Sequence, residues 1–322
     1  SYSKNYTGAQ FVTEIQGGSD VGKNACIASK DAKGQWSITG EKWFCSNVDA
    51  ELILLTARYD QKISGTKGLG LFLVPAKLED STPNHYSIRR LKEKLGTRTM
   101  ASGELDFCGA QAYLIDKPEN GFAILMQDVL HVSRVFNAVC VLGQSYRAYQ
   151  IAFWYAQYRT SFGKSIIDYP LVQEQLARVK AENIAMRAAV FAVSSLQDRY
   201  DQGKITGKEH GLLIRLLVNI NKYMTSYLAV RHVHSCIDVL AGNGVIESFS
   251  SLPRLLRDCF VCENWEGTHN TLRMQTLRDL HKYQVGGLFA KHIKSILKNC
   301  NDIKYKKLIE TKLSDLEKKL KD

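Results

Sequence analysis

A regular cysteine framework is missing from this sequence. Its eight cysteines are scattered, and the only close pair, Cys259 and Cys262, has no second pair or nearby histidine to complete a zinc site. We therefore expect no metal centre, and we interpret the cysteines as reduced thiols of a cytosolic or organelle-matrix protein. Phe260 and Val261 indicate that the close pair belongs to a packed structural segment.

Long apolar runs are also missing. No run approaches the roughly 18 residues needed to cross a bilayer, so we expect no membrane span. The N-terminal stretch SYSKNYTGAQ lacks the charged-then-apolar pattern of a signal peptide. These two absences predict a cytoplasmic protein, or a mitochondrial-matrix protein if the source is eukaryotic.

The sequence has no glycine fingerprint of a dinucleotide-binding sheet. Gly65, Gly68 and Gly70 form one cluster, but they precede a strand pattern instead of joining a strand to a helix. A doubly wound nucleotide-binding fold is therefore not expected, and we interpret the cluster as a loop.

The chain does have a large apolar fraction and an excess of positive charge. With 322 residues and 45% hydrophobic content, it can bury a substantial core in two domains or one large one. The formal net charge is +11, and over half of it comes from residues 281–322, with eleven Lys against five Asp and Glu. This tail suits an anionic partner such as DNA, or it is the solvated face of a helix.

Two periodicities divide the chain. Up to about Leu114, short β-branched and aromatic runs alternate with Gly, Asp, Asn and Pro, which predicts seven or eight strands. Alternation at Trp36 and Ile38, and again within 69–73, predicts strands with one buried and one exposed face. After Pro118 the period becomes helical.

We expect helices over roughly 121–158, 171–202, 207–241 and 268–299, followed by an amphipathic helix in 302–322. A core-facing stripe is predicted on the second helix at Leu176, Val179, Ile184, Ala188, Phe191 and Leu196. The fold class is therefore α+β. It comprises an N-terminal antiparallel β-barrel or sandwich domain (1–117), a C-terminal four-helix-bundle domain (118–290) and a Lys-rich helical tail (291–322).

Six segments carry residues suited to chemistry. Residues 13–20 combine two glycines with hydroxyl groups, which lets backbone N–H groups approach an anionic ligand. The polar and aromatic residues 43–47 suit a flat ring, and the remaining candidates are 91–98, 159–164, the helix stop 238–244 and Trp265–Thr268. In the last of these, a carboxylate precedes a helix for which Thr268 is the expected N-cap.

Taken in this order, the six segments resemble the acyl-CoA dehydrogenase family from about Gln10 to Arg278. The strings VTEIQGGSDV, GEKWFCSN, RLKEKLGTRTMASGELDF, SLPRLLRD and WEGTHN are most similar to its adaptive-response, AidB-like branch. The resemblance implies FAD as cofactor and removal of two hydrogens from an acyl-CoA thioester. Its alternative is a DNA-binding alkylation-response flavoprotein with little dehydrogenase turnover.

The resemblance assigns cofactor contacts to five groups of residues. It implies that Gln10, Phe11, Val12, Thr13, Gly17, Gly18 and Ser19 line the flavin, with Ser19 also near substrate, and that Phe44, Cys45 and Ser46 face the ring. It implies that Arg159, Ser161, Asp238, Val239, Leu240, Ala241 and Gly242 reach FAD of a neighbouring subunit. Thr268, His269 and Asn270 return to the flavin.

The resemblance makes Glu266 the base that removes the α proton, with Arg134 and Gly267 contacting substrate. Some relatives place their base beside the residue matching Arg134, but that neighbour here is Ser133. The implied partners are acyl-CoA, a homodimeric or homotetrameric assembly, and electron-transfer flavoprotein. Dehydrogenase and oxidase activity both remain open.

Two features depart from the family pattern. Pro170 stands where many relatives use Gln to contact FAD. The family also has an N-terminal helical domain that closes the acyl pocket, whereas nine residues precede Gln10. We therefore expect a shortened form whose substrate specificity, stability or turnover is altered.

Overall fold

The computed structural model describes residues 5–320. The first four residues of SYSKNYTGAQ, and Lys321 and Asp322 at the end of the Lys-rich tail, lie outside the described residues. Contacts within the chain define two units: a barrel unit up to Val132 and a helical unit from Ser133 onward.

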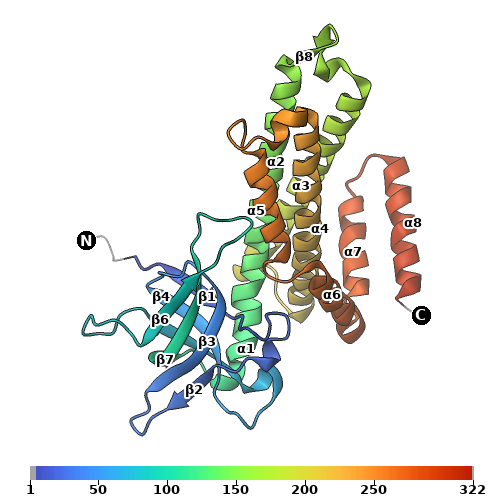
Figure 1. Ribbon diagram of the computed structural model, residues 1–322. Coiled ribbons are helices and arrows are strands. Elements are labelled where there is room, and N and C mark those ends of the chain that lie inside the picture. The colour runs from blue at the N-terminus through green and yellow to red at the C-terminus, as the bar shows by residue number, and fades with distance from the viewer. Residues whose placement is uncertain (1–4, 321–322) are drawn as a thin grey trace. The chain divides into compact units, whose positions relative to one another are not determined.

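Seven strands form the sheet of the barrel unit. They are β1 (Gly8–Phe11), β2 (Ile27–Lys30), β3 (Trp36–Ser46), β4 (Leu52–Arg58), β5 (Leu69–Pro75), β6 (Tyr86–Leu91) and β7 (Ser102–Leu114). Strands β4, β2, β3, β7 and β5 pair in that order, and β5 pairs back with β4, so these five close into a barrel (Figure 1). Every ladder is antiparallel except those of β1 and β2 with β4. The predicted small barrel is confirmed.

The strands alternate as predicted on β3 but not on β5. On β3, Ile38 and Cys45 lie in the barrel core. On β5, Phe72 and Val74 lie in the core, yet Leu71 on the opposite face is also buried. The reason is the short helix α1 (Gly121–Ile124): its Gly121 packs so closely that a Cβ there would lie 2.3 Å from the Leu71 nitrogen. On the outer face of β5, Leu69 and Leu71 are therefore covered, and only Leu73 and Pro75 keep partial exposure.

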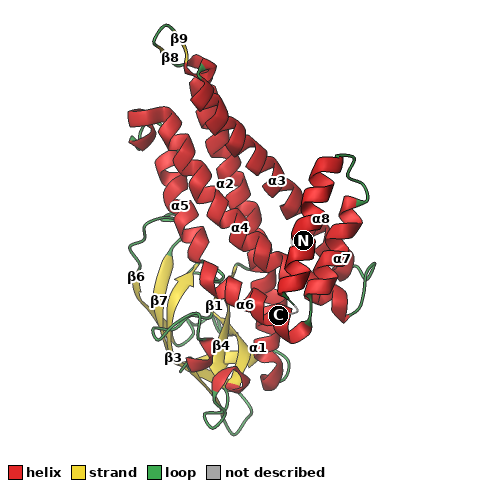
Figure 2. Ribbon diagram, turned by 90° about the vertical axis from the view of Figure 1, so that its right-hand side faces the viewer, coloured by secondary structure: helices red, strands yellow, loops and turns green. Residues whose placement is uncertain are grey.

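Four long helices form the bundle of the helical unit: α2 (Leu130–Tyr158), α3 (Pro170–Asp201), α4 (Lys208–Leu240) and α5 (Leu252–Asn264) (Figures 1 and 2). A π-helical turn, Leu125–Val129, leads into α2, and the hairpin of β8 (Thr160–Ser161) and β9 (Lys164–Ser165) follows it. The bundle is followed by α6 (His269–Tyr283), α7 (Gly286–Leu297) and α8 (Ile303–Lys319). Short 3₁₀ turns occur at Val21–Lys23, Gly65–Gly68, Pro118–Asn120, Ile166–Asp168 and Ala241–Val245.

Three helix predictions need correction. The stretch 268–299 contains two helices, because Gln284 adopts a left-handed conformation (φ 52°) that ends α6. Helix α5 was not expected as a helix. On α3 the buried stripe is Leu176, Val179, Asn183, Met186, Val190 and Val193. Ile184, Ala188 and Phe191 are exposed, because the buried face passes through Asn183, Met186 and Val190 instead.

One helical stretch, Pro118–Tyr158, is long and apolar enough to cross a bilayer by length and composition, contrary to the expectation from the sequence. Polar residues interrupt it, so no continuous apolar run stands out. Core helices of helical bundles meet the same criterion. This one contributes Ala148, Ala152 and Ala156 to the bundle core.

Candidate active site

The turn between α5 and α6 carries Glu266 in a constrained conformation. Glu266 (φ 58°) and Gly267 (φ 109°) are both left-handed, so two consecutive residues reverse the chain where only the second is free of a Cβ. Thr268 then caps α6 by accepting a hydrogen bond from the Thr271 nitrogen, at 3.4 Å, which confirms the predicted N-cap.

Two buried cations hold this turn through its backbone. The Lys222 ammonium is fully buried and donates to the carbonyls of Glu263 (2.9 Å) and Gly267 (2.8 Å). Arg134 Nε donates to the Glu266 carbonyl at 2.9 Å. Asn219 and Gln275 hold the Arg134 guanidinium by accepting from its Nη1 at 2.7 and 3.0 Å. The conformation around Glu266 is therefore fixed by α2, α4 and α6 together.

Burial makes the Glu266 carboxyl more basic. Loss of hydration raises its pKa above the ordinary 4.5, and the positive charges of Arg134 and Lys222 offset only part of that rise. The same burial lowers the pKa of Lys222 to about 8 and that of Arg134 to about 10. A desolvated carboxyl of this kind is suited to taking a proton from a weak carbon acid.

A second carboxyl lies next to the turn. Burial raises the pKa of Glu263, whose Oε1 lies 3.8 Å from His269 Nε2. Loss of hydration, followed by repulsion from Lys222 and Arg273, lowers the pKa of His269, and this ring stands edge-on to Tyr223 at 5.0 Å between centroids. His269 and Glu263 therefore join the group around Glu266.

The sequence analysis missed Lys222, Asn219, Gln275 and Glu263. A signal for the first two was present, because Asn219, Asn221 and Lys222 are polar residues close together on α4, directly after the apolar run 216–218.

In the barrel unit, a buried ion pair anchors the glycine loop 13–19. Lys42 Nζ lies 2.7 Å from Glu14 Oε1, and both side chains are almost fully buried. The Thr13 carbonyl also accepts from the Trp43 nitrogen at 2.9 Å. Gly18 packs against the Thr13 side chain, where a Cβ would lie 2.8 Å from Oγ1. Nothing lies within 4 Å of a Cβ built on Gly17.

The residues predicted to contact the flavin from β1 and β3 divide by face. Phe44 is 56% exposed, and Ser46 Oγ hydrogen-bonds to Ser102 Oγ at 2.8 Å. The side chains of Phe11 and Cys45 instead lie in the barrel core, because successive strand residues point to opposite faces, so only their backbone can reach a ligand outside the barrel. Burial raises the pKa of the Cys45 thiol to about 12.

The other members of this set lie on or near the same loop. Gln10 is half-buried at the end of β1, and the Val12 carbonyl accepts from Asn24 Nδ2 at 2.7 Å. Ser19 is exposed beside Gly18. The barrel unit thus brings together Thr13, Gly17, Gly18 and Ser19 on one loop, and that loop is tied to β3 next to Phe44.

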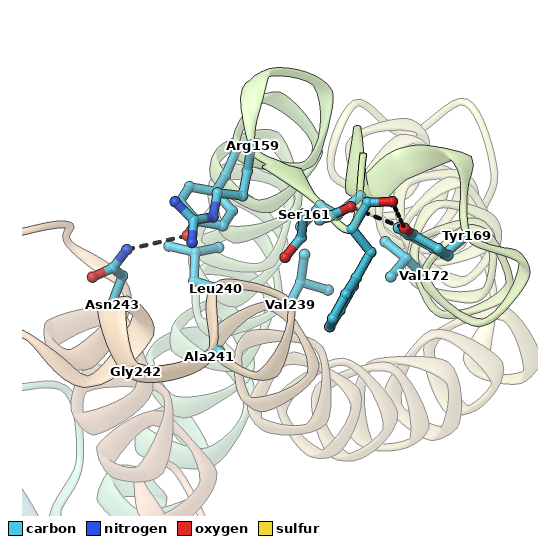
Figure 3. Close-up of a pocket in the computed structure, with 12 residues that line it drawn as sticks. Arg159, Ser161, Tyr169, Val172, Val239, Leu240, Ala241, Gly242 and Asn243 are labelled. Atoms are coloured by element: carbon cyan, nitrogen blue, oxygen red, sulfur yellow. Dashed lines mark hydrogen bonds between the residues drawn. The ribbon is translucent and has the colours of Figure 1, made fainter. Parts of the chain in front are cut away.

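An open pocket of about 560 Å³ lies at the end of the bundle near the β8–β9 hairpin. Figure 3 shows Arg159 and Ser161 facing the turn of Val239, Leu240, Ala241, Gly242 and Asn243. Asn243 Nδ2 donates to the Tyr155 hydroxyl at 3.1 Å, and the Tyr169 hydroxyl donates to the Ser161 carbonyl at 2.9 Å. Ala241 (φ 50°) ends α4 here, as the predicted helix stop requires.

Asp238 departs from this group. It is exposed on the last turn of α4 and accepts from Gln175 Nε2 at 3.1 Å, and it does not line the pocket. The β8–β9 hairpin, beside which the pocket lies, and the α5–α6 turn are at opposite ends of the helical unit (Figure 1). Asn270 is exposed at the start of α6, close to Glu266 in the chain.

No group of three or more His, Cys, Asp and Glu side chains within residues 5–320 is arranged to hold a metal ion. All eight cysteines are free thiols. Cys259 and Cys262 are buried in the bundle core, as a structural pair should be, but Phe260 between them is 38% exposed.

Comparison with known proteins identifies both units. The sequence model described as acyl-CoA dehydrogenase, middle domain, matches residues 9–110, and that of the acyl-CoA dehydrogenase C-terminal domain matches residues 119–281. Among curated relatives, acyl-CoA dehydrogenase family member 11 of Caenorhabditis elegans is 33% identical over 99% of this chain and 53% of its own length. The putative acyl-CoA dehydrogenase AidB of Escherichia coli is 32% identical over 84% of this chain and 48% of its own.

Solved structures agree. Caenorhabditis elegans ACDH-11, in complex with C11-CoA, superposes with a TM-score of 0.92 at 32% identity, over 98% of this chain and 55% of that one. Butyryl-CoA dehydrogenase from Megasphaera elsdenii gives a TM-score of 0.76 at 26% identity, over 85% and 68%. The chain spans about half the length of the first two curated relatives. It belongs to the acyl-CoA dehydrogenase family, whose members are FAD flavoproteins, and carries the family's middle and C-terminal domains.

Proposed function

We propose that this protein is an FAD-dependent oxidoreductase that dehydrogenates an acyl-CoA thioester between its α and β carbons, with Glu266 as the base. The observation that carries the proposal is a desolvated carboxyl with a raised pKa on a turn held rigidly by Lys222 and Arg134. The C11-CoA bound to the Caenorhabditis elegans relative supports a medium-chain acyl thioester as the substrate class.

The barrel residues fit a flavin. The Thr13 side chain fills the space that a Cβ on Gly18 would need, and Gly17 is open, so the loop can bring backbone N–H groups close to a ligand. Gln10–Ser19 would hold the pyrimidine side and pyrophosphate, while Phe44, the Cys45 backbone and Ser46 would lie against the ring. When bound, FAD supplies the acceptor for the hydride that leaves the β carbon.

Glu266 would take the α proton onto its carboxylate. The raised pKa brings its basicity closer to that of the carbon acid, and the excluded water strengthens interactions with the developing enolate. The Glu266 N–H would donate to the thioester oxygen, and Gly267 leaves room beside it. Arg134 would position this turn and the CoA side of the substrate, while Thr268, His269 and Asn270 would approach the flavin.

We infer that the pocket of Arg159 and Ser161 serves the FAD of a second subunit. Its separation from the α5–α6 turn argues against one continuous site within the helical unit. The guanidinium of Arg159 and the backbone of 239–242 suit a pyrophosphate. The assembly would be a homodimer or homotetramer, with electron-transfer flavoprotein or oxygen as the final electron acceptor.

Anaerobic reduction of the flavin by an acyl-CoA tests this function. The purified protein should be yellow and should bleach when a C10–C12 acyl-CoA is added without oxygen. A colourless protein that does not take up added FAD would contradict the proposal.

A second function, binding of DNA through the tail, rests on the exposed lysines of α8. Among them Lys304, Lys307 and Lys312 are exposed, but Glu317 pairs with Lys294 across the α7–α8 hairpin at 2.9 Å. Acidic residues therefore interrupt the basic face, and we favour a solvated surface. Replacing Lys304, Lys307 and Lys312 with Gln should flatten the salt dependence of DNA binding only if this face contacts phosphates.

A further inference from the structure

The hydroxyl of Ser46 belongs to a short chain of hydrogen bonds within the barrel unit. Ser46 ends β3 and lies opposite Ser102, the first residue of β7. Their Oγ atoms are 2.8 Å apart, so one hydroxyl donates to the other. Ser102 is buried (3% exposed), whereas Ser46 is only half-buried and can reach a ligand.

Lys94 biases the direction of that bond. Its ammonium lies 2.9 Å from Ser102 Oγ, and it is held in place by a second bond to the Met100 carbonyl at 2.7 Å. An ammonium can only donate, so Ser102 Oγ accepts from Lys94. Accepting from a cation makes the Ser102 hydroxyl a stronger donor and a weaker acceptor, although its oxygen keeps a second lone pair. This polarisation favours donation of the Ser102 proton to Ser46, which leaves the Ser46 proton available to an acceptor other than Ser102.

We propose that Lys94 and Ser102 are positioning residues that fix Ser46 as a hydrogen-bond donor to the ligand of the barrel unit. The chain Lys94 to Ser102 to Ser46 starts at a positive charge, and successive hydrogen bonds polarise one another, so it also strengthens the last donor. Without Lys94, the two serines can exchange roles, and Ser46 spends part of its time donating to Ser102.

A fixed donor selects for an acceptor atom in the ligand. An unprotonated ring nitrogen or a carbonyl oxygen satisfies it, whereas a C–H in the same place leaves the hydroxyl without a partner and weakens binding. The inference rests on the proposed function, in which Ser46 lies against the flavin ring, and N5 of oxidised FAD is the ring acceptor that the test addresses.

The test compares binding of FAD with that of 5-deaza-FAD, in which a C–H replaces N5. Dissociation constants are measured by fluorescence titration of the 322-residue chain stripped of cofactor. We expect the unmodified protein to bind FAD about tenfold more tightly than 5-deaza-FAD, in line with the loss of one neutral hydrogen bond. This ratio should fall to about 1 in Ser46→Ala. In Lys94→Met it should fall about threefold, because Ser46 then donates to the ring only part of the time.

Three controls separate the possible causes. Lys94→Arg keeps a cationic donor and should retain most of the ratio, and Ser37→Ala removes a hydroxyl elsewhere on β3 and should leave it unchanged. Adding Lys94→Met to Ser46→Ala should have no further effect on the ratio, because the two residues act through one bond. An unchanged ratio in Lys94→Met, or an additive effect in the double variant, would overturn the inference. Failure of the unmodified protein to bind FAD would instead count against the proposed function.

Discussion

Each unit of the molecule buries a carboxyl near a lysine, and the two pairs behave differently. In the barrel unit, Lys42 donates directly to the Glu14 carboxylate at 2.7 Å, and the Cys26 nitrogen adds a bond at 3.1 Å. In the helical unit, Lys222 donates to backbone carbonyls beside Glu266, whose pKa rises. The same two side-chain types give a fixed anchor in one place and a proposed base in the other.

The difference arises from the secondary structure around each lysine. Lys42 lies on β3 with its side chain buried in the barrel unit, where its ammonium donates to the Glu14 carboxylate. The Lys222 ammonium instead donates to the Glu263 carbonyl at the C-terminal end of α5. The last carbonyls of a helix have no hydrogen-bond partner within the helix. The lysine satisfies those carbonyls, so its charge acts on Glu266 only at a distance.

The largest expected effect comes from Glu266→Gln. If this carboxylate removes the α proton, the rate of flavin bleaching should fall about 10²- to 10⁴-fold with FAD still bound. Glu263→Gln is the matched control, because it removes the other carboxyl with a raised pKa near the turn. A larger loss in Glu263→Gln than in Glu266→Gln would move the base to Glu263.

The same variant has a predicted effect on stability. Because the folded pKa of Glu266 is raised, its contribution to stability is full below about pH 4.5 and is lost as the pH rises through the folded value. Gln at position 266 does not ionise, so the Glu266→Gln variant does not lose this stability as the pH rises. Its melting temperature should therefore exceed that of the unmodified protein at pH 7, and the two temperatures should converge near pH 4. A lower melting temperature at pH 7 would show that ionised Glu266 stabilises the fold.

Breaking the barrel pair should be the largest change in stability. Lys42→Met leaves Glu14 charged and buried without its ammonium partner, and we expect a loss of about 3–5 kcal/mol in urea unfolding. Adding Glu14→Gln to Lys42→Met should recover part of the loss, because the uncompensated charge is gone. If Lys42→Met alone costs less than about 1 kcal/mol, the pair is not the anchor of the glycine loop.

Lys222→Met should have a smaller effect on stability and a distinctive effect on pH dependence. The carbonyls of Glu263 and Gly267 lose their donor, which should cost about 1–3 kcal/mol. Since the positive charge of Lys222 lowers the pKa of Glu266, its removal should move the acid limb of the kcat/KM profile to higher pH. An acid limb that stays in place would show that the lysine acts only through the backbone.

The smallest expected effect is that of the helix cap. Thr268→Ala removes an acceptor for the Thr271 nitrogen at a long 3.4 Å, so we expect a loss of about 0.5 kcal/mol. Asp302→Ala at the start of α8, where the Asp302 carboxylate accepts from the Tyr305 nitrogen at 3.0 Å, is the comparison and should cost more. If Thr268→Ala costs as much as Lys222→Met, the cap and not the cation holds the turn.

The local patterns of the sequence predicted much of this fold. The closed barrel follows from strand runs separated by turn residues, and the α4 stop and the Thr268 cap follow from short motifs. The pattern failed where packing partners lie far away in sequence. Strand β5 is buried on both faces because Gly121 packs on it, and no pattern within 69–75 contains that information.

The site was predictable in its motifs and not in its supports. Glu266 stands out because of its neighbours in the chain. Lys222 matters because it donates to the carbonyls of Glu263 at the end of α5 and Gly267 in the following turn, 41 and 45 residues later. Phe11 and Cys45 were predicted to contact the flavin because they belong to a motif of consecutive residues. Alternate side chains of a strand point into the core, however, and these two lie there.

The ionisation of Glu266 itself gives the most direct test of the account. Infrared difference spectroscopy of the carboxyl stretch, followed against pH and assigned with Glu266→Gln, measures its pKa in the folded protein. The account predicts a value above 4.5 that rises further in Lys222→Met. A pKa at or below 4.5 would mean that the positive charges of Arg134 and Lys222 outweigh the loss of hydration at Glu266. Glu266 would then be an ionised structural partner of its neighbouring cations, as Glu14 is of Lys42, and not a base.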